Sequence, residues 1–149
     1  MRSRLLALAA LATALATGLV LAAGTGARDA ATVELVAKLK GTNEVPAARA
    51  SNTGRAEIKL NAATGRVCWE FYITKLDGKP TAAHIHKGAK GVSGPVKVPL
   101  GTTYKRQGCT KAAKALVRAI RAKPGAFYVN VHTVKHPAGA MRGQLAKHT

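Results

Sequence analysis

A two-residue alternation of apolar and polar side chains, repeated in short segments, most constrains the fold of this chain. Apolar residues stand at every second position in residues 33–39, again in 56–60, and again in 67–73. Successive side chains of a β-strand point to opposite faces, so this period predicts half-buried strands. Asn-Ala-Ala-Thr-Gly at 61–65 is a turn signal, and it predicts that the second and third segments form a hairpin.

Four more short segments have the same character. They cover residues 81–86, 95–100, 127–133 and 141–146, and the glycine-rich residues 87–94 join the first two. Many short antiparallel strands in about 120 residues favour an all-β domain with a Greek-key sandwich or barrel architecture.

One segment interrupts the β pattern, because residues 111–122 have the period of an amphipathic helix. Thr110 is placed to cap its start, and Pro124 with Gly125 ends it. The apolar side carries Ala113, Leu116, Val117 and Ile120. The opposite side carries a row that we call the basic stripe: Lys111, Lys114, Arg118 and Arg121.

The N-terminus has the three parts of a secretory signal peptide. Two arginines near the start precede an uncharged run rich in Leu and Ala, and small residues follow it. We therefore expect residues 1–27 to be a signal peptide, cleaved after Ala22 or Ala27, and 28–149 to be one domain. The alternative is an uncleaved membrane anchor, for which the Ala, Thr and Gly content is weak. The mature chain has no second long apolar run, which predicts a secreted or cell-envelope location.

Export changes how the two cysteines are interpreted. Cys68 and Cys109 are the only pair, and disulfides persist in secreted chains. Bridging them closes a loop of about 40 residues, which stabilises a fold by roughly 3–4 kcal/mol on the chain-entropy view. We therefore predict a structural disulfide.

Charge is distributed unevenly along the chain. The formal net charge is +18, and all six acidic residues lie at or before position 77. Residues 78–149 contain 14 Lys or Arg and no acid. This half should attract anionic polymers, anionic surfaces or small anions. Nucleic acid is a poor candidate, because aromatic residues for base stacking are scarce and the chain is predicted to be exported.

Strand alternation places three of the five histidines on one face. In 127–133 the apolar set points one way, so His132 points the other way together with Tyr128 and Asn130. In 81–86 the bulky Ile85 points to the core, so His84 and His86 point away from it. If the strands are neighbours, the three imidazoles converge.

Converging imidazoles are a candidate metal site. Two histidines one residue apart on a strand lie about 6–7 Å apart along one face, close enough to bind one ion. Imidazole ligands without carboxylate or thiolate suit copper or zinc. Ordinary exposed histidines are the alternative for so short a motif. His136, in the loop after His132, is a further candidate ligand, and Tyr128 and Asn130 are candidates to support the ligands.

Several longer motifs resemble the CHRD (chordin) domain family, in order and from about residue 32 to 145. They are residues 41–46 (GTNEVP), 81–86 (TAAHIH), 91–96 (GVSGPV), 127–133 (FYVNVHT) and 137–145 (PAGAMRGQL). The resemblance implies an extracellular all-β module, found in exported bacterial proteins and chordin-like animal proteins. The family brings no established catalytic activity.

A weaker resemblance is to copper/zinc superoxide dismutase. The expected all-β fold is a sandwich or barrel of that kind, with the immunoglobulin-like kind as the alternative. His84, His86 and His132 take the places of copper ligands, and Arg142 takes the place of an anion-steering group. The residues of a zinc subsite are missing, so the resemblance implies a copper-only site. Dismutation does not follow from a shared fold.

These observations leave three hypotheses. The first is an exported, non-catalytic CHRD protein that binds one copper or zinc ion through three histidines. The second is a basic extracellular module that docks on anionic cell-envelope polymers or on a protein partner, with the basic stripe as the contact. The third is a superoxide dismutase-like copper enzyme, to which the electropositive half would steer an anionic substrate.

Overall fold

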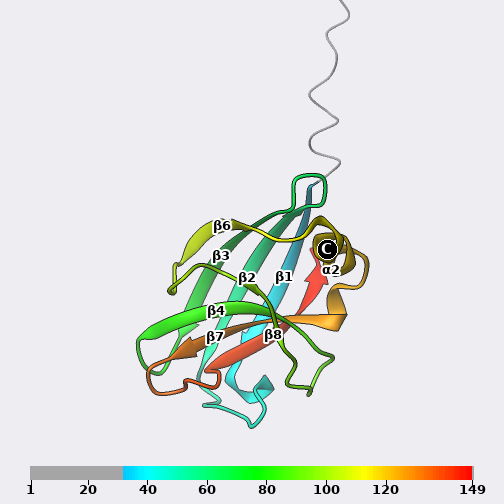
Figure 1. Cartoon of the computed structure of the whole chain (residues 1–149). Coiled ribbons are helices and arrows are strands. Elements are labelled where there is room, and N and C mark those ends of the chain that lie inside the picture. Colours follow the sequence, from blue (N-terminus) through cyan, green and yellow to red (C-terminus); the bar gives the residue numbers. More distant parts are fainter. Residues whose placement is uncertain (1–31, 149) are drawn as a thin grey trace, which may run out of the picture.

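A computed structural model describes residues 32–148 as a β-domain with one helix (Figure 1). The predicted signal peptide, residues 1–27, lies outside the described residues. The strands are β1 (Thr32–Lys40), β2 (Thr53–Asn61), β3 (Arg66–Lys75), β4 (Pro80–Lys87), β5 (Val96–Pro99), β6 (Gln107–Lys111), β7 (Phe127–Thr133) and β8 (Met141–Lys147). The helical elements are η1 (Gly41–Asn43), α2 (Lys114–Ala122) and η2 (Pro124–Ala126).

The eight strands form one antiparallel sheet in the order β5-β4-β7-β8-β1-β2-β3-β6. The sheet curls on itself, so that β4, β7 and β8 cross over β1, β2 and β3 in a nearly closed barrel (Figure 1). The predicted β2–β3 hairpin is present, with Ile58 opposite Trp69. The all-β architecture with one short helix is therefore confirmed.

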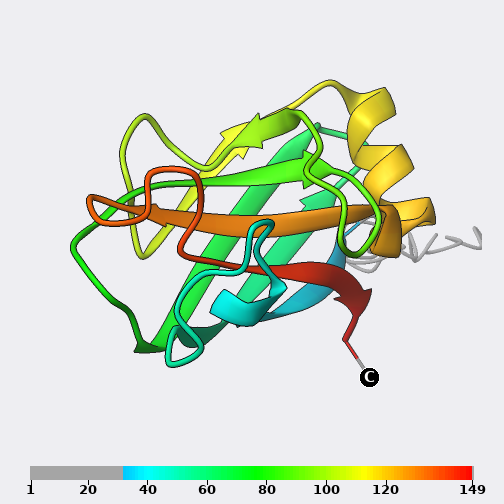
Figure 2. The same ribbon diagram turned by 90° about the horizontal axis from the view of Figure 1, so that it is seen from below.

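The core lies between the two halves of the curled sheet. Leu35 of β1 and Ile58 of β2 belong to the same buried cluster as Ile85 of β4 and Val129 of β7. The residues of this cluster stand at alternate positions, as the period predicted. Helix α2 covers one end of the barrel, where Val117 and Ile120 join the cluster (Figure 2).

The start of the helix was predicted wrongly. Residues Gln107–Lys111 form strand β6 and pair with β3, and α2 begins only at Lys114. Ala113 precedes the helix without a side-chain hydrogen bond, so Thr110 does not cap it. The sequence of β6 lacks large apolar residues at alternate positions, and it is a strand because β3 offers it a partner. The basic stripe is consequently divided, with Lys111 on β6 and the other three residues on α2.

The predicted disulfide is confirmed. Cys68 of β3 and Cys109 of β6 are directly opposite each other in the sheet and are joined by a disulfide bond. The bond fastens β6, which is an edge strand, to the strand beside it. It therefore holds one of the two open edges of the sheet in place.

Candidate metal centre

The three histidines lie on the outer face of neighbouring strands β4 and β7. In the register, Ala82 is opposite His132 and His84 is opposite Asn130. Ala83 and Ile85, which alternate with His84 and His86, are buried in the core. The structure therefore places the histidines on the face predicted from strand alternation.

The three imidazole rings converge on one point. Each offers a ring nitrogen, and these nitrogens all lie within 4.8 Å of one another. Nδ1 of His84 is 3.0 Å from Nε2 of His132. The ring centroids of His84 and His86 are 5.7 Å apart. Three nitrogens at this spacing can bind a single metal ion with small side-chain adjustments.

Two of the rings are oriented by backbone carbonyls. Nδ1 of His86 is 2.9 Å from the carbonyl oxygen of Gly94, and Nδ1 of His132 is 2.9 Å from that of Pro137. A carbonyl oxygen only accepts, so both Nδ1 atoms must donate, and the lone pair of each neutral ring is on Nε2. Hydrogen bonds of this kind fix the tautomer and orientation of metal-binding histidines in proteins.

The surroundings also keep two of the rings, those of His84 and His86, uncharged. Burial, with smaller effects of the neighbouring His132 and His86, lowers the pKa of His84 to about 4. Burial also lowers the pKa of His86, although its hydrogen bond to Gly94 opposes the shift. Metal ligation needs neutral imidazole. His84 and His86 are therefore in the uncharged state that metal ligation needs at neutral pH.

Tyr128 packs against the second ligand. Its ring is stacked on that of His86, with centroids 4.9 Å apart and planes inclined by 9°. The Tyr128 hydroxyl accepts a hydrogen bond of 3.1 Å from the Gly94 N–H. The guanidinium carbon of Arg142 lies 4.7 Å from the Tyr128 ring centroid. Tyr128 thus contacts both the His86 ring and the loop whose carbonyl orients that ring.

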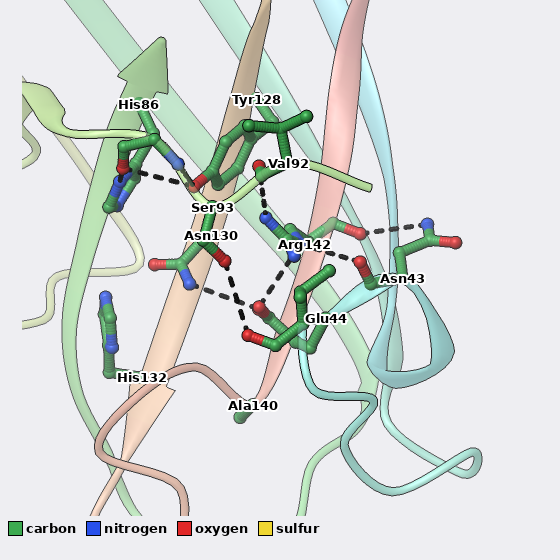
Figure 3. A network of polar contacts seen from close by, with 12 residues as sticks. Asn43, Glu44, His86, Val92, Ser93, Tyr128, Asn130, His132, Ala140 and Arg142 are labelled. Carbon is green, nitrogen blue, oxygen red and sulfur yellow. Dashed lines mark hydrogen bonds and ion pairs between the residues drawn. The ribbon is translucent and has the colours of Figure 1, made fainter. Parts of the chain in front are cut away.

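A buried polar network lies beside the histidines (Figure 3). Arg142 is 3% exposed, and its Nε is 2.7 Å from the carbonyl oxygen of Asn43 and 3.3 Å from Oε2 of Glu44. Its Nη1 donates to the carbonyl oxygen of Val92. Oε1 of Glu44 accepts a hydrogen bond of 3.1 Å from Nδ2 of Asn130. Arg142 therefore binds protein oxygens below the surface, where the weaker resemblance suggested an anion-steering group.

Sequence reasoning missed Glu44. Its carboxylate is buried, which raises its pKa, and the charge of Arg142 opposes that shift. It lies in the loop between β1 and β2, in the GTNEVP motif that carried the family resemblance. An ion pair between distant parts of the chain cannot be recognised from neighbouring residues. The chain has only six acidic residues, however, and this scarcity could have drawn attention to Glu44.

His136 lies outside the histidine group. Its Nε2 is 3.4 Å from Oδ2 of Asp77, whose carboxylate also pairs with Lys135 and Arg49. Hydrogen bonds from Lys135 and Arg49 hold the pKa of Asp77 at about 2. The side chain of His136 is therefore part of an ion cluster at the loop after β7.

Basic residues also surround a groove on the surface of the barrel. It has a volume of about 470 Å³ and lies over the outer face of β1 and β8. Lys38, Lys40, Lys90 and Arg142 are among its lining residues, and none of the lining residues is acidic. Separately, Lys114 and Arg118 are exposed on α2.

Among residues 32–148, no helix is both long and apolar enough to cross a membrane. A comparison with known families gives a match to the CHRD domain over residues 35–145. No curated protein and no solved structure matches the chain. The matched region begins in β1 and ends in β8, and it includes all three histidines and the network around Glu44. The chain therefore belongs to the CHRD domain family.

Proposed function

We propose that this CHRD domain binds one copper or zinc ion through His84, His86 and His132. The observation that carries the proposal is the convergence of three imidazole nitrogens within 4.8 Å of one another. The two backbone carbonyls that orient His86 and His132 support it, since they direct Nε2 of both rings to the same space.

The donor set favours copper or zinc over other ions. All three ligands are imidazoles, whereas magnesium and calcium take oxygen ligands. Both cysteines are in a disulfide, so they supply no thiolate to the site. Three protein ligands leave a further coordination position on the metal. The proposed role is metal binding outside the cytoplasm, with residues 1–27 as the export signal and without a catalytic step.

Metal analysis tests this proposal directly. The protein is purified without a histidine tag, loaded with Cu(II) or Zn(II), desalted and analysed for metal content. We expect one ion per chain in the wild type and none after His84→Ala/His86→Ala. His148→Ala is the matched control, because His148 is exposed and lies outside the histidine group. Equal metal content in the wild type and the double variant would refute the proposal.

A second candidate function is docking on an anionic cell-envelope polymer. The specific observation in its favour is the groove lined by Lys38, Lys40 and Lys90 without an acidic neighbour in its wall. Opposite charge attracts acidic polymers to such a surface, and salt screens the attraction. The basic residues of α2 are the other candidate contact.

Charge reversal separates the two contacts. Binding to an acidic polysaccharide is measured for Lys38→Glu/Lys40→Glu and for Lys114→Glu/Arg118→Glu, which change the net charge equally. If the groove is the contact, the first variant should lose more affinity than the second. Binding that does not weaken with rising salt would contradict the electrostatic docking proposal.

A further inference from the structure

A fourth polar side chain, Asn130, stands on the same sheet face directly opposite His84. It is 3% exposed, and its Nδ2 donates to Oε1 of Glu44. A carboxylate only accepts hydrogen bonds, which fixes the orientation of the amide. The oxygen Oδ1 must therefore point the other way. Figure 3 shows it on the side of Asn130 where His86 and His132 lie.

Two buried acceptors at this place have no hydrogen-bond partner in the described protein. They are Oδ1 of Asn130 and Nε2 of His86. Neither can satisfy the other, because the N–H of neutral His86 is on Nδ1 and is donated to Gly94. Moving the proton to Nε2 would leave the Gly94 carbonyl facing a lone pair. Unpaired buried acceptors are costly, so a cation and a hydrogen-bond donor are what this space lacks.

The pairing of β4 with β7 places the Asn130 side chain beside the histidines. His84 is directly opposite Asn130, and His86 follows His84 on the same face of β4. Asn130 is also next to Tyr128 along the outer face of β7, and Tyr128 is opposite His86. The amide oxygen therefore lies at the edge of the space that the imidazoles surround.

We propose that Oδ1 of Asn130 accepts a hydrogen bond from a water molecule bound at the metal's fourth position, an inference that rests on the proposed metal site. Sites with three protein ligands keep such a position for water. A neutral amide oxygen suits hard cations, so it is a weak direct ligand for copper or zinc. As an acceptor for metal-bound water it is well suited, because the metal makes that water a stronger donor.

The surrounding chain keeps the amide in this orientation. Glu44 accepts a hydrogen bond from Nδ2 of Asn130, and Arg142 forms an ion pair with Glu44. The loop before β8 passes directly over this pair at Gly139. A Cβ on Gly139 would lie 2.7 Å from Nδ2 of Asn130 and from the Glu44 carboxylate, and φ there is +145°. Only glycine fits so close an approach. Glu44 is therefore a positioning residue, which acts on the site through Asn130.

This arrangement selects between ligands at the fourth position. Water or another ligand with a proton satisfies Oδ1, whereas azide has no proton to donate and meets the lone pairs of the amide oxygen. Asn130→Leu removes the acceptor and keeps a similar volume. Asn130→Asp keeps an oxygen there and adds a negative charge. Gln144→Leu is the control for an amide-to-leucine change on the same sheet face, since the Gln144 amide donates to carbonyls of the neighbouring loops.

The experiment measures Cu(II) affinity and then azide affinity of the copper-loaded full chain, from the change in its visible spectrum. We expect Asn130→Leu to bind copper as the wild type does. It should bind azide roughly five- to tenfold more tightly than the wild type, which corresponds to the free energy of about one hydrogen bond. Asn130→Asp should bind azide more weakly than the wild type. Gln144→Leu should change neither affinity.

The possible outcomes separate the two proposals. If the wild type binds no copper, the proposed function itself fails. If it binds copper and both Asn130 variants bind azide as the wild type does, the water-anchoring role is wrong. If Asn130→Leu instead loses roughly a hundredfold or more in copper affinity with azide affinity unchanged, Asn130 is a direct ligand and the water-anchoring role is again wrong. Should Asn130→Leu not fold, the direction of the change in Asn130→Asp decides the question.

Discussion

Nδ1 of His84 is 3.0 Å from Nε2 of His132, on the neighbouring strand. His132 donates its own proton from Nδ1 to Pro137, so Nε2 accepts and His84 donates across this gap. In the metal-free protein one hydrogen bond therefore joins two candidate ligands. A metal ion bound between these two nitrogens would take the place of the proton on Nδ1 of His84, and that ring would stay neutral by carrying its proton on Nε2 instead. Both rings would keep nearly the positions they already have.

The first prediction concerns stability. An ion that binds only the folded state should raise the free energy of unfolding, by about 2.7 kcal/mol at a free concentration of 100 times the Kd. Thermal unfolding followed with increasing Zn(II) should show a rising midpoint in the wild type. His132→Ala should show no rise, and His148→Ala should behave as the wild type. A midpoint that rises equally in all three proteins would point to nonspecific binding.

The second prediction concerns Tyr128. Its ring is stacked on His86 and its hydroxyl holds Gly94, so Tyr128→Leu should loosen the ligand without removing it. We expect a metal affinity about 10-fold lower, as for other groups that orient ligands. Tyr72→Leu is the control, because Tyr72 is 41% exposed on β3. Titration calorimetry measures both, and equal affinities would show that Tyr128 does not orient His86.

The third prediction concerns the buried ion pair. Removing one partner, as in Arg142→Met, leaves the Glu44 carboxylate buried without its cation, which costs about 3–5 kcal/mol. The double variant Glu44→Gln/Arg142→Met should lose less than the sum of the single changes. Urea unfolding of the four proteins measures the coupling. Additive losses would mean that the two side chains do not stabilise each other.

The fourth prediction concerns the disulfide. Cys68→Ser/Cys109→Ser should lower the free energy of unfolding by about 3–4 kcal/mol, because the unfolded chain regains the freedom of the closed loop. Metal affinity should not change, since β6 is separated from β7 in the sheet order by four strands. A loss of metal binding in the folded variant would mean that the edge strand affects the site.

The fifth prediction concerns acid. The pKa of Asp77 is about 2 in the folded protein, against an ordinary value of 3.8. A carboxyl group with a lowered pKa stabilises the folded state at pH values above its ordinary pKa. That stabilisation is lost as the pH falls from about 4 towards 2. Wild type and Asp77→Asn should therefore differ in unfolding midpoint at pH 6 and converge near pH 2. If the unfolding midpoints of the two proteins differed as much at pH 2 as at pH 6, the prediction would be wrong.

The sequence predicted the features that depend on neighbouring residues and missed those that depend on contacts between distant segments. Alternation is local, so it gave most strands and the face of all three histidines. It failed at residues 107–111, where a strand exists only because β3 pairs with it. The pairing of β4 with β7, which brings His132 to His84, was a conditional expectation, because no local pattern states which strands are neighbours.

The surroundings of the site were the least predictable part. The carbonyls of Gly94 and Pro137 orient two rings. Every residue has a main-chain carbonyl, so the residue types at these positions do not reveal this role. Glu44 and Arg142 are 98 positions apart along the chain and meet only in the fold. The anion-steering role implied for Arg142 requires solvent exposure, and the loops around residues 43 and 92 bury it instead.

The use of main-chain carbonyls to orient His86 and His132 has an evolutionary consequence. A substitution that keeps the path of the backbone leaves both carbonyls in place. Apart from Gly94 and Gly139, where a Cβ would be too close to its neighbours, residues in the two loops are therefore free to change without disturbing the rings. Divergent descendants of this chain could therefore retain the centre while their loop sequences drift apart. A search for the centre in such relatives should look for the histidine pattern on two paired strands and should place little weight on the loops.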